Sequence, residues 1–71
     1  MKINVEKYNL SRAQIEHLID QWIFSERDRS ILKRRLLDHV LFEQLAEEFS
    51  LSVNQTKTIV YKALDRLEKH I

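Results

Sequence analysis

Polar side chains with two kinds of binding chemistry alternate between residues 54 and 62. Asn54 and Gln55 carry carboxamides, which can bind N6 and N7 of adenine together, and Thr58 carries a hydroxyl and a methyl group that can each meet a base edge. Lys57 and Lys62 carry cations that bind phosphate oxygens. This mixture predicts base reading by Asn54, Gln55 and Thr58, and phosphate binding by the two lysines.

Charge is distributed in blocks along the chain. Residues 25–37 carry a net charge of +3, residues 38–52 carry −4, and residues 53–71 carry +2, although the whole chain carries only +1. This order favours a basic surface on one side of the molecule over general coating of nucleic acid. The further residues predicted to bind phosphate are Arg34, Arg35 and Tyr61.

The chain offers little for catalysis or for metal binding. It has no cysteine, and its three histidines, His17, His39 and His70, are too scattered for metal-ligand spacing. No nucleophile stands at a meaningful spacing from a base, and 71 residues leave little room for a pocket. We therefore predict a protein that is not an enzyme and that uses no metal and no cofactor.

The elements that must position these side chains are predicted to be helices, because glycine and proline are both absent. Ser11 opens an S-x-x-Q capping box before a helix with an apolar stripe. Ser25, followed by acidic residues, caps a second helix that ends near His39. With residues 1–10 as an N-terminal arm, residues 11–71 are predicted to form one compact all-α domain of three to four helices.

The segment from about 42 to 69 has the spacing of a helix-turn-helix. Such a motif needs apolar residues where its two helices cross, a small residue at their closest approach and a tight turn between them. Ala46 is the small residue, and Ser52 is placed to cap the second helix. The apolar crossing positions, counted from Phe42 as the first, are Leu45, Phe49, Leu51 and Ile59.

The second helix of this motif, beginning near Val53, divides into two sides at about 100° per residue. Its inner side is predicted to hold Val53, Thr56, Ile59, Val60, Ala63, Leu64 and Leu67. Its outward side is predicted to hold Asn54, Thr58, Tyr61, Lys62 and Lys69, flanked by Gln55 and Lys57. Asp65 and Glu68 follow two to three turns later, so only the N-terminal half of the outward side suits a major groove.

Residues 25–71, about two thirds of the chain, resemble the C-terminal DNA-binding region (region 4) of bacterial sigma factors of the sigma-70 class. Residues 25–36, SERDRSILKRRL, are similar to the first helix of that region. Residues 42–52, FEQLAEEFSLS, are similar to its E-E-I-A-E-x-hydrophobic-turn segment, and residues 59–67, IVYKALDRL, match its closing K-A-L-x-x-L helix.

The resemblance implies roles for particular residues. In that family the start of the last helix reads promoter bases, the arginine that ends the preceding helix binds phosphate, and the first helices grip a flap of RNA polymerase. The phosphate-binding role falls here on Arg35, and the base-reading roles fall on Val53, Asn54, Gln55, Lys57 and Thr58. Because the domain with which sigma factors melt promoter DNA is missing, the resemblance implies a stand-alone regulator, of the kind found in a phage or mobile element.

The chain departs from the family pattern at several positions. His39 and Ser50 stand where the family has glycine, and both positions are expected to need a positive φ. Leu41 replaces the usual threonine cap, Val53 replaces an arginine, and Thr56 replaces an aliphatic core residue. The family's base preference is therefore not carried over to this chain.

Two functions follow from these observations and stay open. The first is sequence-specific binding of double-stranded DNA by a small transcriptional regulator, strengthened by a homodimer or by a second DNA-bound partner. The second is a protein-interaction module that docks on RNA polymerase, a sigma factor or another transcription factor through the acidic Glu43, Glu47 and Glu48 or the leucine-rich second helix. No apolar run reaches the ~20 residues of a membrane span and no signal peptide is evident, so we expect a cytoplasmic, nucleoid-associated protein with no membrane partner.

Overall fold

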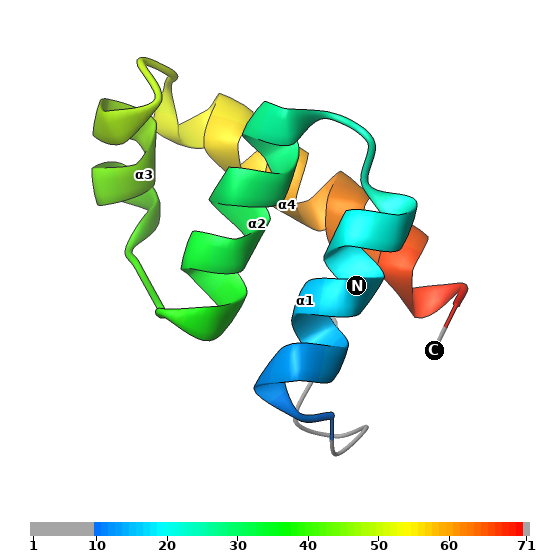
Figure 1. Ribbon diagram of the computed structural model, residues 1–71. Helices are drawn as coiled ribbons and strands as arrows, with labels where there is room; N and C mark the ends of the chain where they lie inside the picture. Colours follow the sequence, from blue (N-terminus) through cyan, green and yellow to red (C-terminus); the bar gives the residue numbers. More distant parts are fainter. Residues whose placement is uncertain (1–9, 71) are drawn as a thin grey trace.

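Four helices make up the computed structural model, which describes residues 10–70 (Figure 1). They are α1 (Arg12–Trp22), α2 (Glu26–Leu37), α3 (Phe42–Glu48) and α4 (Val53–Glu68). No strand occurs within residues 10–70, which confirms the all-α class. The predicted arm at residues 1–10 lies outside this description except for Leu10, which packs against the core.

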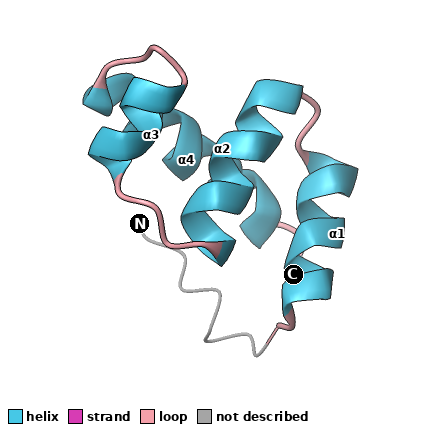
Figure 2. Cartoon of the chain, turned by 60° about the vertical axis from the view of Figure 1, so that its left-hand side comes forward, coloured by secondary structure: helices cyan, strands magenta, loops and turns pink. Residues whose placement is uncertain are grey.

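The long helix α4 organises the fold because it contacts each of the other three helices. In Figure 1, α3 and α1 lie on opposite sides of α2, and α4 starts beside α3 and runs behind α2 and α1. Figure 2 shows from another side how α3 stands away from α1, while α2 lies between them. No helix in residues 10–70 has the length and apolar content needed to cross a membrane.

Serine side chains begin three of the four helices, as predicted for each of them. Ser11 Oγ accepts the N–H of Gln14, Ser25 Oγ accepts that of Asp28, and Ser52 Oγ accepts that of Gln55. These bonds satisfy backbone donors that a helix leaves unpaired at its start. At α3 the N-cap is Leu41, which provides no such bond, so the loss of this cap expected from the sequence is confirmed.

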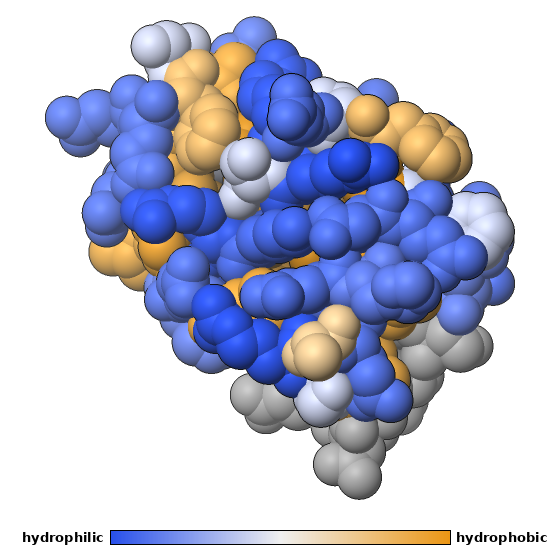
Figure 3. All heavy atoms as spheres, in the orientation of Figure 1, coloured by the Kyte–Doolittle hydropathy of each residue, from blue (hydrophilic) through white to orange (hydrophobic). Residues whose placement is uncertain are grey.

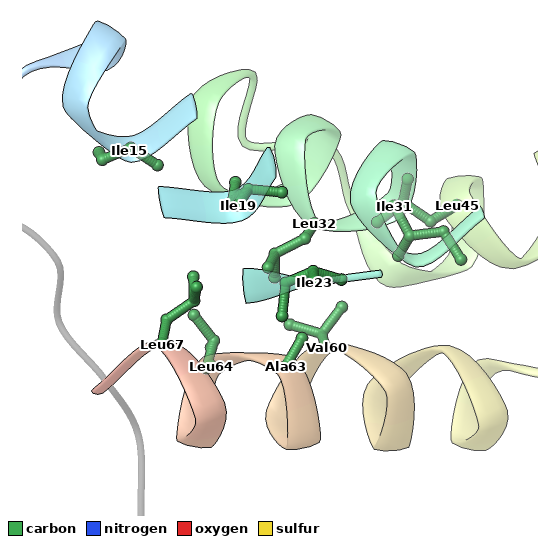
Figure 4. Packing of buried hydrophobic residues seen from close by; sticks show 10 residues of the cluster. All are labelled: Ile15, Ile19, Ile23, Ile31, Leu32, Leu45, Val60, Ala63, Leu64 and Leu67. Carbon is green, nitrogen blue, oxygen red and sulfur yellow. The ribbon is translucent and has the colours of Figure 1, made fainter. Parts of the chain in front are cut away.

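One apolar core joins all four helices (Figure 4). Figure 4 shows Val60, Ala63, Leu64 and Leu67 of α4 facing side chains of the other helices. The fully buried apolar side chains are Ile19, Ile31, Leu32, Leu45 and Val60. Thr56 is fully buried among them, and its Oγ1 donates to the Ser52 carbonyl at 2.9 Å, which satisfies the hydroxyl inside the core. The buried residues of α4 therefore all belong to its predicted inner side.

Charged side chains tie α1 to α2 on the side of the molecule shown in Figure 3, where hydrophilic groups predominate. Lys33 is half-buried, with Nζ 2.7 Å from Asp20 Oδ1. The hydrogen bond from Lys33 lowers the pKa of Asp20. Arg12 similarly reaches Asp38 at 3.2 Å. A local helical pattern could not reveal these pairs, because their partners come from different helices.

Two residues adopt a positive φ, as expected from their positions. His39 has φ 56° after α2, and Ser50 has φ 55° after α3. The N–H of Leu51 donates to the Ala46 carbonyl at 2.8 Å, and that of Ser50 donates to the Glu47 carbonyl at 3.4 Å. These two bonds form a Schellman motif, in which the residue with positive φ is usually glycine. The sharp turn between α3 and α4 is therefore built at some conformational cost.

Replacing each of these residues with glycine should stabilise the protein. A non-glycine residue with a positive φ destabilises the folded state by about 1–2 kcal/mol. Glycine removes this strain, but it raises the conformational entropy of the unfolded chain, which lowers the free energy of unfolding by about 0.4–1 kcal/mol. We therefore expect H39G and S50G each to raise the free energy of unfolding by about 0.5–1 kcal/mol in urea titrations. The control Glu47→Gly, inside α3, should lower it by a similar amount. Destabilisation by S50G would show that the turn is not strained.

Candidate nucleic-acid interface

The outward side of α4 is exposed along its whole length, as the sequence predicted. Asn54, Thr58 and Lys62 are exposed, while Val60 and Leu64 on the opposite side are buried. On the wheel of a 3.6-residue helix, Asn54 and Thr58 occupy the middle of the exposed side. Packing of the inner side against α1, α2 and α3 therefore fixes which polar groups face outward.

One flank of this side is organised by the ring of Phe42 at the start of α3. The Arg35 guanidinium lies over the ring with its carbon 4.2 Å from the centroid, and Lys57 Nζ lies 5.8 Å from it. Tyr61 meets the same ring edge-on, with centroids 6.0 Å apart. Arg35 is also fixed by donating from Nη1 to the Val40 carbonyl at 3.0 Å. The structure thus brings together three residues that were predicted to bind phosphate.

The other flank carries Lys62 and Arg66. Both line a hollow between α4 and the α1–α2 connection, together with Thr58 and Phe24. The Arg66 guanidinium carbon lies 5.8 Å from the centre of the Phe24 ring, which is 69% exposed. Figure 3 shows apolar atoms at this connection. Two uncharged side chains, Asn54 and Thr58, are therefore bordered by cations on both sides.

Gln55, predicted to read bases, is engaged in capping α4. Its Oε1 accepts the backbone N–H of Ser52 at 2.9 Å, while Ser52 Oγ accepts the N–H of Gln55 at 3.0 Å. Bidentate recognition of adenine needs the carboxamide oxygen as well as its nitrogen. The capping box uses one lone pair of that oxygen and holds the carboxamide against the backbone of Ser52, so Gln55 is less available than Asn54 for a bidentate contact.

Arg34, also predicted to bind phosphate, does not join the residues around the Phe42 ring, because an ion pair holds it elsewhere. Its Nη2 lies 2.7 Å from Glu48 Oε2, and Gln44 Nε2 donates to the same oxygen at 3.3 Å. Arg34 Nε is buried without a hydrogen-bond partner among residues 10–70. Arg34 and Arg35 are neighbours in sequence, but they point to different sides of α2. Phosphate would have to compete with Glu48 for Arg34.

If this surface binds DNA, neutralising Glu48 should strengthen that binding. In E48Q the Arg34 guanidinium loses its charged partner and becomes available to a phosphate. The variant can therefore gain at most one phosphate contact. One contact contributes about 0.9 to the slope of log affinity against log salt, or nearly tenfold in affinity near 0.1 M salt. The matched control is E47Q, because Glu47 is exposed and makes no ion pair within the described chain. Equal effects of the two variants would show that Arg34 is not the group released.

Sequence reasoning missed two participants in this surface. Phe42 was used only as the first position of the motif, although its ring gathers Arg35, Lys57 and Tyr61. Arg66 was not selected, although it lies one turn beyond Lys62 on the same flank. Phe42 and Lys57 are 15 residues apart in the sequence, and only the packing of α3 on α4 brings the ring and the lysine together.

Among residues 10–70, no group of three or more His, Cys, Asp or Glu side chains is placed to hold a metal ion. Comparisons of the chain with protein-family models, with curated proteins and with solved structures found no match. The function proposed below therefore rests on the geometry of α4 and its surroundings.

Proposed function

We propose that this protein binds double-stranded DNA as a small transcriptional regulator, with α3 and α4 acting as a helix-turn-helix. The N-terminal half of α4 lies in the major groove. A helix with its side chains is about 10–12 Å across, and the major groove is about 12 Å wide. The short turn at residues 49–52 and the buried Ala46, where the helices meet, support this assignment.

The observation that carries the proposal is the order of side chains across α4. Asn54 and Thr58 stand in the middle, with Lys57 on one flank and Lys62 on the other. Groups that contact base edges must reach the floor of a groove, whereas cations bind the phosphates that border it. Arg35, fixed against Phe42, extends the first flank toward the backbone of the duplex.

The small number of cations sets the expected strength of binding. Three cations, Arg35, Lys57 and Lys62, contact phosphate together with the neutral hydroxyl of Tyr61, which is fewer than the 6–10 charged contacts that make DNA binding steeply salt-dependent. The acidic residues of α3 add repulsion, and Arg34 is neutralised by Glu48. A single copy should therefore bind a mixed duplex only at micromolar concentrations, and a homodimer or a neighbouring DNA-bound protein would raise the effective affinity.

Fluorescence titration of labelled mixed-sequence duplex at low salt tests this proposal. We expect saturable binding in the micromolar range and a slope of log affinity against log salt of about −2.7, from three cations. The absence of binding at tens of micromolar would overturn the proposal. A slope near zero would also contradict it, because the assigned contacts are mainly electrostatic.

A second candidate function is a protein-interaction module that docks on RNA polymerase, a sigma factor or another transcription factor. Two exposed apolar side chains favour it, since Phe24 is 69% and Leu41 is 64% exposed. Leu41 precedes the exposed acidic residues Glu43 and Glu47. Exposed apolar groups beside charges are typical of docking surfaces. Failure to bind DNA, together with capture of purified RNA polymerase that is abolished by L41A or F24A, would favour this function.

A further inference from the structure

We infer that the protein prefers DNA with adjacent A·T base pairs, read by Asn54 and Thr58; this inference rests on the proposed function. In the middle of the outward side of α4, some hydrogen-bonding groups are free to contact bases, whereas others are already bonded within the protein. The residue types predicted base reading by Asn54, Gln55 and Thr58. In the structure Gln55 is engaged in the capping box, which leaves Asn54 and Thr58.

Asn54 is the free carboxamide. Its side chain is exposed and makes no hydrogen bond to any residue of the described chain, so both its oxygen and its nitrogen are available. Adenine presents N7 as an acceptor and N6 as a donor in the major groove, which matches a carboxamide in a bidentate contact. Gln55 is less available for this contact, because its oxygen accepts the Ser52 N–H and its carboxamide is held against the backbone.

Thr58 offers its methyl group and not a hydroxyl proton. Its Oγ1 donates to the Asn54 carbonyl at 2.9 Å, so the proton is used inside the helix. The apolar part of an exposed threonine suits the C5-methyl group of thymine, a feature that only A·T pairs present in the major groove. Thr58 is therefore assigned to a thymine.

No guanine reader stands beside these two residues. Guanine is read most often by a bidentate Arg or Lys, but Lys57 is drawn toward the Phe42 ring and Lys62 lines the hollow beside Phe24. Four residues along a helix span about 6 Å, against about 3.4 Å per base pair. The adenine and the thymine contacts therefore fall on base pairs one or two steps apart.

Selection of bound sequences from random duplex DNA tests this inference with four proteins: the wild type, N54A, T58V and T58S. The wild type should enrich A·T about tenfold at two positions within three base pairs. N54A should lose the preference at one position and keep it at the other. T58V keeps a methyl group and should retain the second preference, whereas T58S lacks that methyl and should lose it.

The outcomes separate this inference from the proposed function. Binding with no base preference, or with G·C enriched at these positions, overturns the inference and leaves DNA binding intact. Loss of preference in T58V but not in T58S would overturn the assignment of the methyl group. No binding by a wild-type protein with a helical circular dichroism spectrum would overturn the proposed function itself. All substituted positions are exposed, so each variant should show that same spectrum.

Discussion

L45A should lower the free energy of unfolding by about 2–5 kcal/mol, the range for removing a fully buried leucine side chain. Leu45 is 0% exposed and lies where α3 joins the core. At about 0.05–0.15 kcal/mol per residue, a domain of this size has a total stability of roughly 4–10 kcal/mol. The substitution should therefore remove a large fraction of that stability, and with it the packing that orients α4. Urea unfolding followed by circular dichroism measures the effect.

Leu41 provides a matched control for this substitution. It is 64% exposed, so L41A removes the same atoms from a position that contributes little to the core. We expect a change within about 0.5 kcal/mol, because surface substitutions usually fall in that range. Similar losses in L41A and L45A would contradict the assignment of Leu45 to the centre of the α3–α4 packing.

K57A combined with K62A should weaken DNA binding by roughly 50- to 100-fold near 0.1 M salt. Each phosphate contact contributes about 0.9 to the slope of log affinity against log salt, so losing two contacts should make that slope shallower by about 1.8. The loss should be similar for all duplex sequences, because phosphate contacts carry no base information. Titrations at three or four salt concentrations measure both quantities.

Lys69 is the control for this pair of lysines. It is exposed and follows the last residue of α4 as its C-cap, with Nζ 3.9 Å from Asp65 Oδ2. We expect K69A to change the affinity by no more than about twofold and to leave the salt slope near its original value. An effect of K69A as large as that of K57A with K62A would show that binding depends on overall charge and not on the N-terminal half of α4.

Much of the fold could be predicted because its determinants are local in sequence. Capping serines at Ser11, Ser25 and Ser52 define where three helices begin. The apolar periodicity between Thr56 and Leu67 defines the side of α4 that is buried. The family pattern located both residues with positive φ, His39 and Ser50, although neither is glycine. Local hydrogen bonding and helical periodicity are enough for each of these predictions.

The availability of the site residues was harder to predict, because it depends on which partners each side chain meets. For Gln55 a local pattern existed, since Ser52 and Gln55 repeat the S-x-x-Q capping box recognised at Ser11, yet the carboxamide was assigned to bases. For Arg34 no local pattern existed, because Glu48 lies 14 residues away and reaches it only when α3 packs on α2. The gathering of Arg35 and Lys57 at Phe42 likewise depends on three different helices meeting.

We propose that the outward side of α4 faces DNA bases. Titration of the ¹⁵N-labelled protein with a short duplex, followed by NMR, tests it most directly. The Asn54 side-chain NH₂ and the backbone amides of Lys57, Thr58 and Lys62 should shift together and saturate, while those of exposed α1 residues such as Ala13 and His17 should stay unchanged. Shifts confined to α1 or to the acidic residues of α3, with Asn54 and Thr58 unaffected, would contradict the account.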